Sequence, residues 1–104
     1  MINTSAMPYS VEFEQSVIGG FLLLAESDSR RAAVLAWLDA HDFYREDHRL
    51  IFRALQVMAA KQQPIDLLTL HTHLDKLGVL ADAGGLAYLA RLAKDTPSAA
   101  NIIA

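Results

Sequence analysis

The sequence contains no cysteine, so disulfide bonds, thiolate metal sites and cysteine nucleophiles are all excluded. It also has no apolar run approaching the ~20 residues that a helix needs to span a bilayer. The N-terminal segment Met1–Met7 lacks both the basic region and the apolar region of a secretory signal peptide. Together these absences favour a soluble protein of the cytoplasm.

Positive charge is also scarce, and it is not clustered. Nine Lys and Arg residues stand against twelve Asp and Glu residues, which gives a formal net charge of -3. A module that held DNA alone would need clustered cations to neutralise several phosphates. Because short helices joined by tight turns can mimic a helix-turn-helix, a small helical DNA-binding module is an alternative hypothesis. The charge argues against it, and we expect little or no direct DNA binding.

Motifs for nucleotide chemistry are missing as well. No G-x-x-x-x-G-K-[ST] segment occurs, so no loop for the phosphates of ATP is expected. The pair Gly19-Gly20 costs helix propensity, about 1 kcal/mol for each glycine, and predicts the close approach of another helix. Loop geometry explains Gly84-Gly85. Nothing in the spacing of serine and histidine suggests a triad, so we expect no catalytic residue and no cofactor site.

The histidines are candidates for a metal site. His71 and His73 lie two residues apart on an expected helix, about 200° around its axis, and cannot bind one ion. His41 and His48 lie on another segment, with Asp42 and Asp47 nearby. A metal-dependent helical enzyme is therefore a third hypothesis. We interpret the histidines as surface residues and expect no metal ligand.

Helical periodicity runs through most of the chain, and sustained period-2 alternation is absent. We expect one all-α domain, a compact bundle of five to six short helices. It covers residues 8–95, after a disordered tail at 1–7. Residues 96–104 should begin a further helix or linker that ends in a truncation. The expected helices are one that opens after Ser10 and ends before Glu26, then 30–38, 46–61, 66–77 and 86–94.

Caps and apolar stripes orient these helices. Ser10 and Asp66 are the expected N-caps, and Gly78 is expected just after the fourth helix. Both aromatic side chains of the connector, Phe43 and Tyr44, should pack into the core. The other expected inner residues are Ala33, Val34, Trp37 and Leu38, then Ile51, Phe52, Leu55, Met58 and Ala59, then Leu67, Leu70, Leu74, Leu77 and Leu80, and finally Leu86, Leu89, Ala90 and Ala93.

The acidic residues of the first helix are interpreted structurally. Glu12 and Glu14 lie two residues apart and face different ways, so they do not predict a carboxylate pair for acid–base catalysis. Favourable charge in the first helical turn and capping account for both. The mixed-charge run 45–49 is interpreted as a solvated helix start.

Six short motifs follow one another over roughly residues 8–101. They are Pro8-x-Ser10-x-Glu12-x-Glu14-Gln15-x-Val17-Ile18-Gly19, Asp42-Phe43-Tyr44, His48-x-x-Ile51-Phe52, Pro64-x-Asp66-Leu67 with Thr69-Leu70, Gly84-Gly85-x-x-Tyr88-Leu89, and Thr96-Pro97-Ser98-Ala99-Ala100-Asn101. Their order and spacing resemble the N-terminal domain of DnaB-type replicative helicases. The fit is poorest over residues 25–39, and Phe13 is bulkier than the small residue usual there. Both departures bear on partner specificity more than on fold.

The resemblance implies a non-catalytic interaction domain. In that family the domain forms a collar on a homohexameric, RecA-like motor, pairs into dimers that build a three-fold ring, and binds the C-terminal helicase-binding domain of primase. Loader proteins also act on the hexamer in some lineages. ATP and Mg²⁺ belong to the motor domain, whose motifs are absent from this chain. The chain alone is expected to be a monomer or to dimerise through its head.

Two residues are candidate partner contacts by the same resemblance. Glu12 is expected at an exposed helix start, and Tyr88 offers an apolar ring with a polar tip, a combination common at interfaces. The alternative interpretations are interaction with the helix dipole for Glu12 and core packing for Tyr88.

Overall fold

Five α-helices and one short 3-10 helix make up the part of the computed structural model that is described, residues 10–94. The elements are α1 (Val11–Leu23), α2 (Ser29–Trp37), η2 (Ala40–Asp42), α3 (Glu46–Ala60), α4 (Leu67–Lys76) and α5 (Gly85–Lys94). No strand occurs in this range, so the all-α prediction is confirmed. The expected tail at 1–7 and the expected sixth helix fall outside the described residues.

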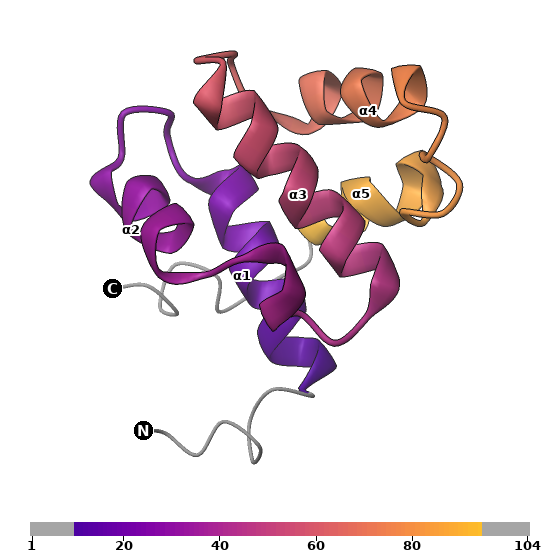
Figure 1. Cartoon of the computed structure of the whole chain (residues 1–104), viewed down its shortest axis with the longest axis horizontal. Helices are drawn as coiled ribbons and strands as arrows, with labels where there is room; N and C mark the ends of the chain where they lie inside the picture. Colours follow the sequence, from indigo (N-terminus) through magenta and orange to yellow (C-terminus); the bar gives the residue numbers. More distant parts are fainter. Residues whose placement is uncertain (1–9, 95–104) are drawn as a thin grey trace.

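Helix α1 is the element around which the others pack. It contacts α2, α3 and α5, while α4 packs against α3 and α5. Figure 1 shows α3 crossing α1, with α2 on one side and with α4 and α5 on the other. Segments far apart in the sequence therefore meet at α1. Helix α5, near the end of the described chain, packs against α1, near its beginning.

Local signals set most helix boundaries. The side chain of Ser10 accepts a hydrogen bond from the backbone N–H of Phe13, and Asp66 forms a reciprocal capping box with Thr69. Gly78 has φ +76° after α4, as predicted. The same left-handed turn ends α3 at Gln62, with φ 58°.

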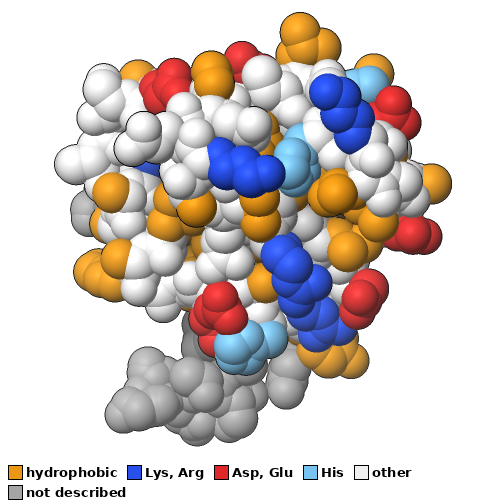
Figure 2. All heavy atoms as spheres, turned by 45° about the horizontal axis from the view of Figure 1, so that its top comes forward, with side chains coloured by type: hydrophobic (Ala, Val, Ile, Leu, Met, Phe, Trp, Pro, Cys, Tyr) orange, Lys and Arg blue, Asp and Glu red, His pale blue; other side chains and the backbone are white. Residues whose placement is uncertain are grey.

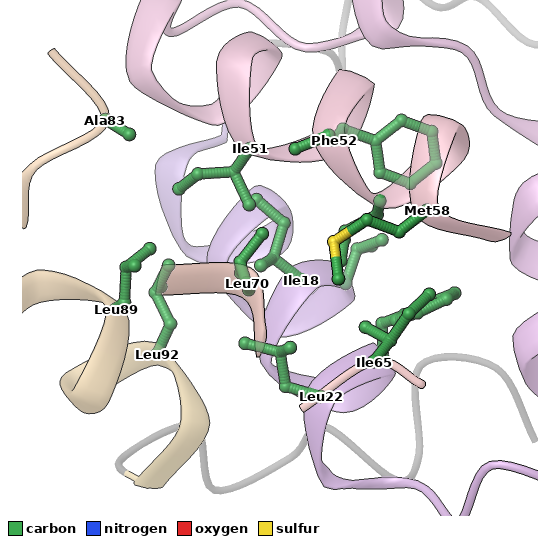
Figure 3. Close-up of a cluster of buried hydrophobic side chains, with 14 of the residues drawn as sticks. Ile18, Leu22, Ile51, Phe52, Met58, Ile65, Leu70, Ala83, Leu89 and Leu92 are labelled. Carbon is green, nitrogen blue, oxygen red and sulfur yellow. The ribbon is translucent and has the colours of Figure 1, made fainter. Parts of the chain in front are cut away.

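The core lies where α1, α3, α4 and α5 meet. Figure 3 shows its labelled side chains converging from these helices and from the loops between them: Ile18, Leu22, Ile51, Phe52, Met58, Ile65, Leu70, Ala83, Leu89 and Leu92. The pair Gly19-Gly20 is buried within α1, as close approach of another element requires. The expected inner faces of α3 and α4 are largely confirmed.

The inner face of α2 is confirmed only in part. Val34 is buried and Leu38 packs against the core, as predicted, but Trp37 is 80% exposed, and Arg31 and Leu35 lie on the inner face instead. Arg31 donates to the carbonyl oxygens of Phe21 and Ile65, at 2.9 and 3.0 Å, which satisfies its buried guanidinium. An apolar pattern missed this face because a charged residue occupies it.

Three further residues expected in the core are exposed. Tyr44 is exposed because it follows the buried Phe43 in extended backbone, where successive side chains point to opposite sides. Leu77 is the C-cap of α4, where the chain turns away. Leu86 lies at the edge of a face of α5 that is centred on Leu89 and Leu92.

Candidate partner-binding site

Four polar side chains from three helices form a hydrogen-bonded chain beneath the start of α1. The Nδ1 atom of His48 lies 2.8 Å from Oε1 of Glu14, and its Nε2 atom lies 2.6 Å from the hydroxyl oxygen of Tyr88. The Nε2 atom of Gln15 donates to the same hydroxyl at 3.1 Å. Glu14 and Gln15 come from α1, His48 from α3 and Tyr88 from α5, so the chain links three helices.

His48 is fully buried, which corrects its interpretation as a surface histidine. It lies on the same face of α3 as Ile51, Phe52 and Leu55, at the helical spacing i, i+3, i+4 and i+7. The mixed-charge run 45–49 is therefore not uniformly solvated. A buried polar ring requires hydrogen-bond partners at both nitrogens, and Glu14 and Tyr88 supply them.

Glu14 is buried and does more than place charge in the first turn of α1. Its carboxylate accepts the backbone N–H of Tyr44 at 2.6 Å and, more weakly, that of Arg45 at 3.4 Å, besides the bond from His48. Burying a carboxylate is costly unless its oxygens are well bonded, and these contacts provide the bonds. Glu14 thus fixes the loop before α3 to α1, whereas Glu12 is exposed.

Counting donors and acceptors assigns the protons along this chain. A carboxylate can only accept, so Nδ1 of His48 carries a proton and donates to Glu14. Neutral imidazole then accepts at Nε2, and the hydroxyl of Tyr88 donates there while accepting from Gln15. Each group in the chain has a partner of the right kind, which makes the arrangement rigid.

The ring of Tyr88 is half-buried and is held on several sides. It stacks on the imidazole of His48 with 5.9 Å between ring centroids and 10° between planes, and the guanidinium carbon of Arg45 lies 5.6 Å from its centroid. A Cβ atom at Gly84 would come within 2.6 Å of Cδ2 of Tyr88. Gly84 therefore leaves room for the tyrosine four residues later.

Arg45 brings a positive charge to the exposed side of Tyr88. Its Nε atom donates to Oδ1 of Asp47 at 3.0 Å, and its Nη2 atom donates to Oδ2 of Asp47 at 2.5 Å. These hydrogen bonds raise the pKa of Arg45 above its ordinary value. The charge over the ring is thus fixed in position as well as in sign.

The two residues predicted as partner contacts lie on one side of the molecule. Glu12 is three residues before Gln15 on α1, and residues at this spacing are neighbours on a helix surface. Gln15 in turn binds the hydroxyl of Tyr88. Val11, also a neighbour of Gln15 on the helix surface, is 37% exposed, whereas Phe13, 44% exposed, lies about 160° around the axis of α1 from Gln15. The structure therefore combines an acidic group, apolar surface and a half-buried tyrosine in one region.

Sequence reasoning missed Glu14, His48 and Arg45 as members of this region. A signal was available, because Glu14, His48 and Tyr88 are the polar residues of three separate motifs of the resemblance. Apolar periodicity could not show that these motifs converge. The other histidines do not join them: His41 is exposed and paired with Asp39, and His71 and His73 are half-buried.

Two features are absent from the described part of the chain. Among residues 10–94, no three His, Asp or Glu side chains come together in a group that could hold a metal ion. None of the helices over the same residues is long and apolar enough to cross a membrane.

Comparison with known proteins gives concordant matches. The family model described as the DnaB-like helicase N terminal domain matches residues 6–104. The replicative DNA helicase DnaB of Haemophilus influenzae is 43% identical over 100 residues, 96% of this chain and 21% of that protein. The replicative DNA helicase DnaC of Bacillus subtilis is 33% identical over 102 residues, 98% of this chain and 22% of that protein.

A solved structure supports the same relationship. The crystal structure of the N-terminal domain of DnaB helicase from Mycobacterium tuberculosis superposes with a TM-score of 0.80 at 38% sequence identity. The match covers 91% of this chain and 67% of that one. The chain thus spans about two thirds of that solved domain and about a fifth of the length of the curated helicases.

Proposed function

Because the chain belongs to the family of DnaB-like helicase N-terminal domains, we propose that it is the collar domain of a hexameric replicative DNA helicase. Its role there is to bind other proteins, including further copies of itself in the collar ring. ATP and Mg²⁺ would act in a motor domain, because this sequence has no phosphate-binding loop. The role also implies a cytoplasmic location.

The proposed main partner is the C-terminal helicase-binding domain of primase, and the proposed contact region contains Glu12 and Tyr88. The observation that carries this proposal is the fixed position of Tyr88, whose hydroxyl is bound by His48 and Gln15 while its ring stays half-exposed. An aromatic side chain that is ordered before binding loses little entropy on association, so it is well suited to anchor a partner.

Glu12 and Phe13 would complete the contact. The carboxylate of Glu12 is exposed and can pair with a basic group of the partner, and Phe13 adds apolar surface beside it. Since relatives usually carry a small residue at the position of Phe13, this side chain would restrict the choice of primase. A helicase loader is a further possible class of partner, without assigned residues.

Calorimetric titration with the C-terminal domain of the cognate primase tests the proposal. Glu12→Ala and Tyr88→Ala should each weaken binding about tenfold, as truncation of a central contact does. Glu26→Ala, which removes an exposed glutamate beyond the other end of α1, is the matched control and should leave affinity unchanged. Circular dichroism would show whether each variant remains folded.

Unchanged affinity in both Glu12→Ala and Tyr88→Ala would remove this contact region. If Tyr88→Ala unfolds the domain, Glu12→Ala and Phe13→Ala still test the surface, because both side chains are exposed. A gel-shift titration with duplex DNA at several salt concentrations addresses the DNA-binding alternative, for which we expect no shift.

A further inference from the structure

A groove lies at the end of the molecule where α3 finishes and α4 runs across it, away from Tyr88. It has a volume of about 590 Å³. Met58 and Pro64 contribute to it from the end of α3 and the following turn, and Leu68 and Leu77 from the two ends of α4. His48 lies ten residues before Met58 on α3, which separates the two along the helix axis by about 15 Å. The groove is therefore distinct from the region of Tyr88.

Apolar side chains are exposed along this groove. Leu68 is 70% and Leu77 61% exposed, and they lie nine residues apart, which corresponds to about 14 Å of helix. Figure 2 shows hydrophobic side chains next to separate Lys and Arg side chains on the face that it brings forward. Because nine residues also turn the helix by about half a revolution, the two leucines border the groove from opposite sides, and a partner helix of two to three turns would pack between them.

The charged groups of the groove have one sign. Lys61 and Lys76 line it, and no carboxylate does. The chain as a whole has a net charge of -3, so this is a locally basic region on an acidic protein. It is complementary to an acidic segment. A second copy of the chain carries the same net negative charge and would be repelled at long range.

One buried atom at the groove lacks a partner. Nε2 of His73 is shielded from solvent, and no hydrogen bond to it is found among the described residues. His73 lines the groove between Lys61 and Lys76. Because the domain itself shields this atom, a segment bound in the groove would not reach it, and the positive charge offered to a partner is that of Lys61 and Lys76.

We propose that this groove binds an acidic amphipathic helix of a partner protein. Leucine-type side chains of that helix would pack against Leu68, Leu77 and Pro64, and its carboxylates would pair with Lys61 and Lys76. This is the helix-in-groove mode of recognition, in which apolar anchors recur at i, i+3, i+4 and i+7. The inference goes beyond the proposed primase contact and does not depend on it.

Amide shifts of the isotope-labelled 104-residue chain, measured by NMR during titration with synthetic peptides, test the proposal. The probe is an 18-residue helical peptide with leucines on one face and glutamates flanking them. Its two controls carry lysines in place of the glutamates, or serines in place of the leucines. Only the glutamate–leucine peptide should bind, with shifts concentrated over residues 58–77.

Charge reversal supplies the matched comparison. Lys61→Glu with Lys76→Glu should weaken binding of the acidic peptide at least about tenfold. Arg91→Glu with Lys94→Glu changes the net charge equally at α5, outside the groove, and should leave affinity nearly unchanged. Leu68→Ser, which alters an exposed side chain, should weaken binding without unfolding the domain.

Several results would overturn the proposal. They are equal binding of the lysine-flanked peptide, shifts centred outside residues 58–77, and unchanged affinity in the Lys61 and Lys76 double variant. Sedimentation provides another. The groove would be an interface between copies of this chain if three results were found together. The chain would self-associate, Leu68→Ser would make it monomeric, and the acidic peptide would not bind.

Discussion

The Nε2 atom of His48 lies 2.6 Å from the hydroxyl oxygen of Tyr88, and the two rings stack with 10° between their planes. His48 is fully buried, whereas Tyr88 is half-buried. The core of the domain thus fixes the orientation of a side chain that reaches its surface.

Replacing His48 by leucine should destabilise the domain by about 3 kcal/mol, because the buried carboxylate of Glu14 loses its charged-group hydrogen bond. Chemical denaturation would measure the loss in the free energy of unfolding. Glu14→Gln keeps the size of the side chain but removes its charge, so His48→Leu should cost less stability in a variant that already carries Glu14→Gln. Equal cost of His48→Leu in both backgrounds would show that the two side chains are not coupled.

Gly84→Ala should be more destabilising than Gly78→Ala. Both glycines have positive φ, +106° and +76°, so each alanine adds backbone strain of about 1–2 kcal/mol. Only at Gly84 would the new Cβ also collide with Tyr88, since nothing lies within 4 Å of a Cβ at Gly78. Thermal unfolding would compare the two variants, and the aromatic proton shifts of Tyr88 should change only in Gly84→Ala. Equal effects on Tyr88 would contradict the contact.

Gln62→Gly should stabilise the domain by about 0.5–1 kcal/mol, because glycine adopts the left-handed conformation without the penalty of a side chain. Gln62 occupies this conformation at the end of α3, where Gln63 donates its N–H to the carbonyl of Met58 at 2.9 Å. The gain is read from urea denaturation. Gln63→Gly, next in the chain and without positive φ, serves as control and should not stabilise.

Asp28 should titrate unusually low. The hydrogen bonds from the Arg30 side chain, with that from its backbone N–H, lower the pKa of Asp28 from its ordinary 3.8 to about 2. A group whose pKa is depressed on folding stabilises the folded state above its unfolded pKa. That contribution is lost as the pH falls from about 4 through about 2.

Carbon-detected NMR titration of the Asp28 carboxyl group would check this value. Arg30→Gln removes the charged donor and should return the pKa of Asp28 toward 3.8. An unchanged titration of Asp28 in Arg30→Gln would show that the arginine side chain is not the cause.

The sequence by itself determined the helical class, most helix boundaries and the family. Caps such as Ser10 and Asp66 act within one turn, and the stripe through Ile51 and Leu55 repeats at the helical period, so neither depends on the rest of the chain. The motif that contains Tyr88 could likewise be recognised in order along the chain.

The tertiary structure alone decided which polar residues are buried. Arg31 and His48 occupy inner positions that an apolar pattern assigns to solvent, and Trp37 lies outside although it is apolar. The reason is that a buried polar group depends on partners distant in the chain, as Glu14 and Tyr88 are for His48. Apolar periodicity describes one helix at a time and does not indicate which distant residues contact it. Tyr88 was therefore identifiable from the sequence, but the side chains that hold it were not.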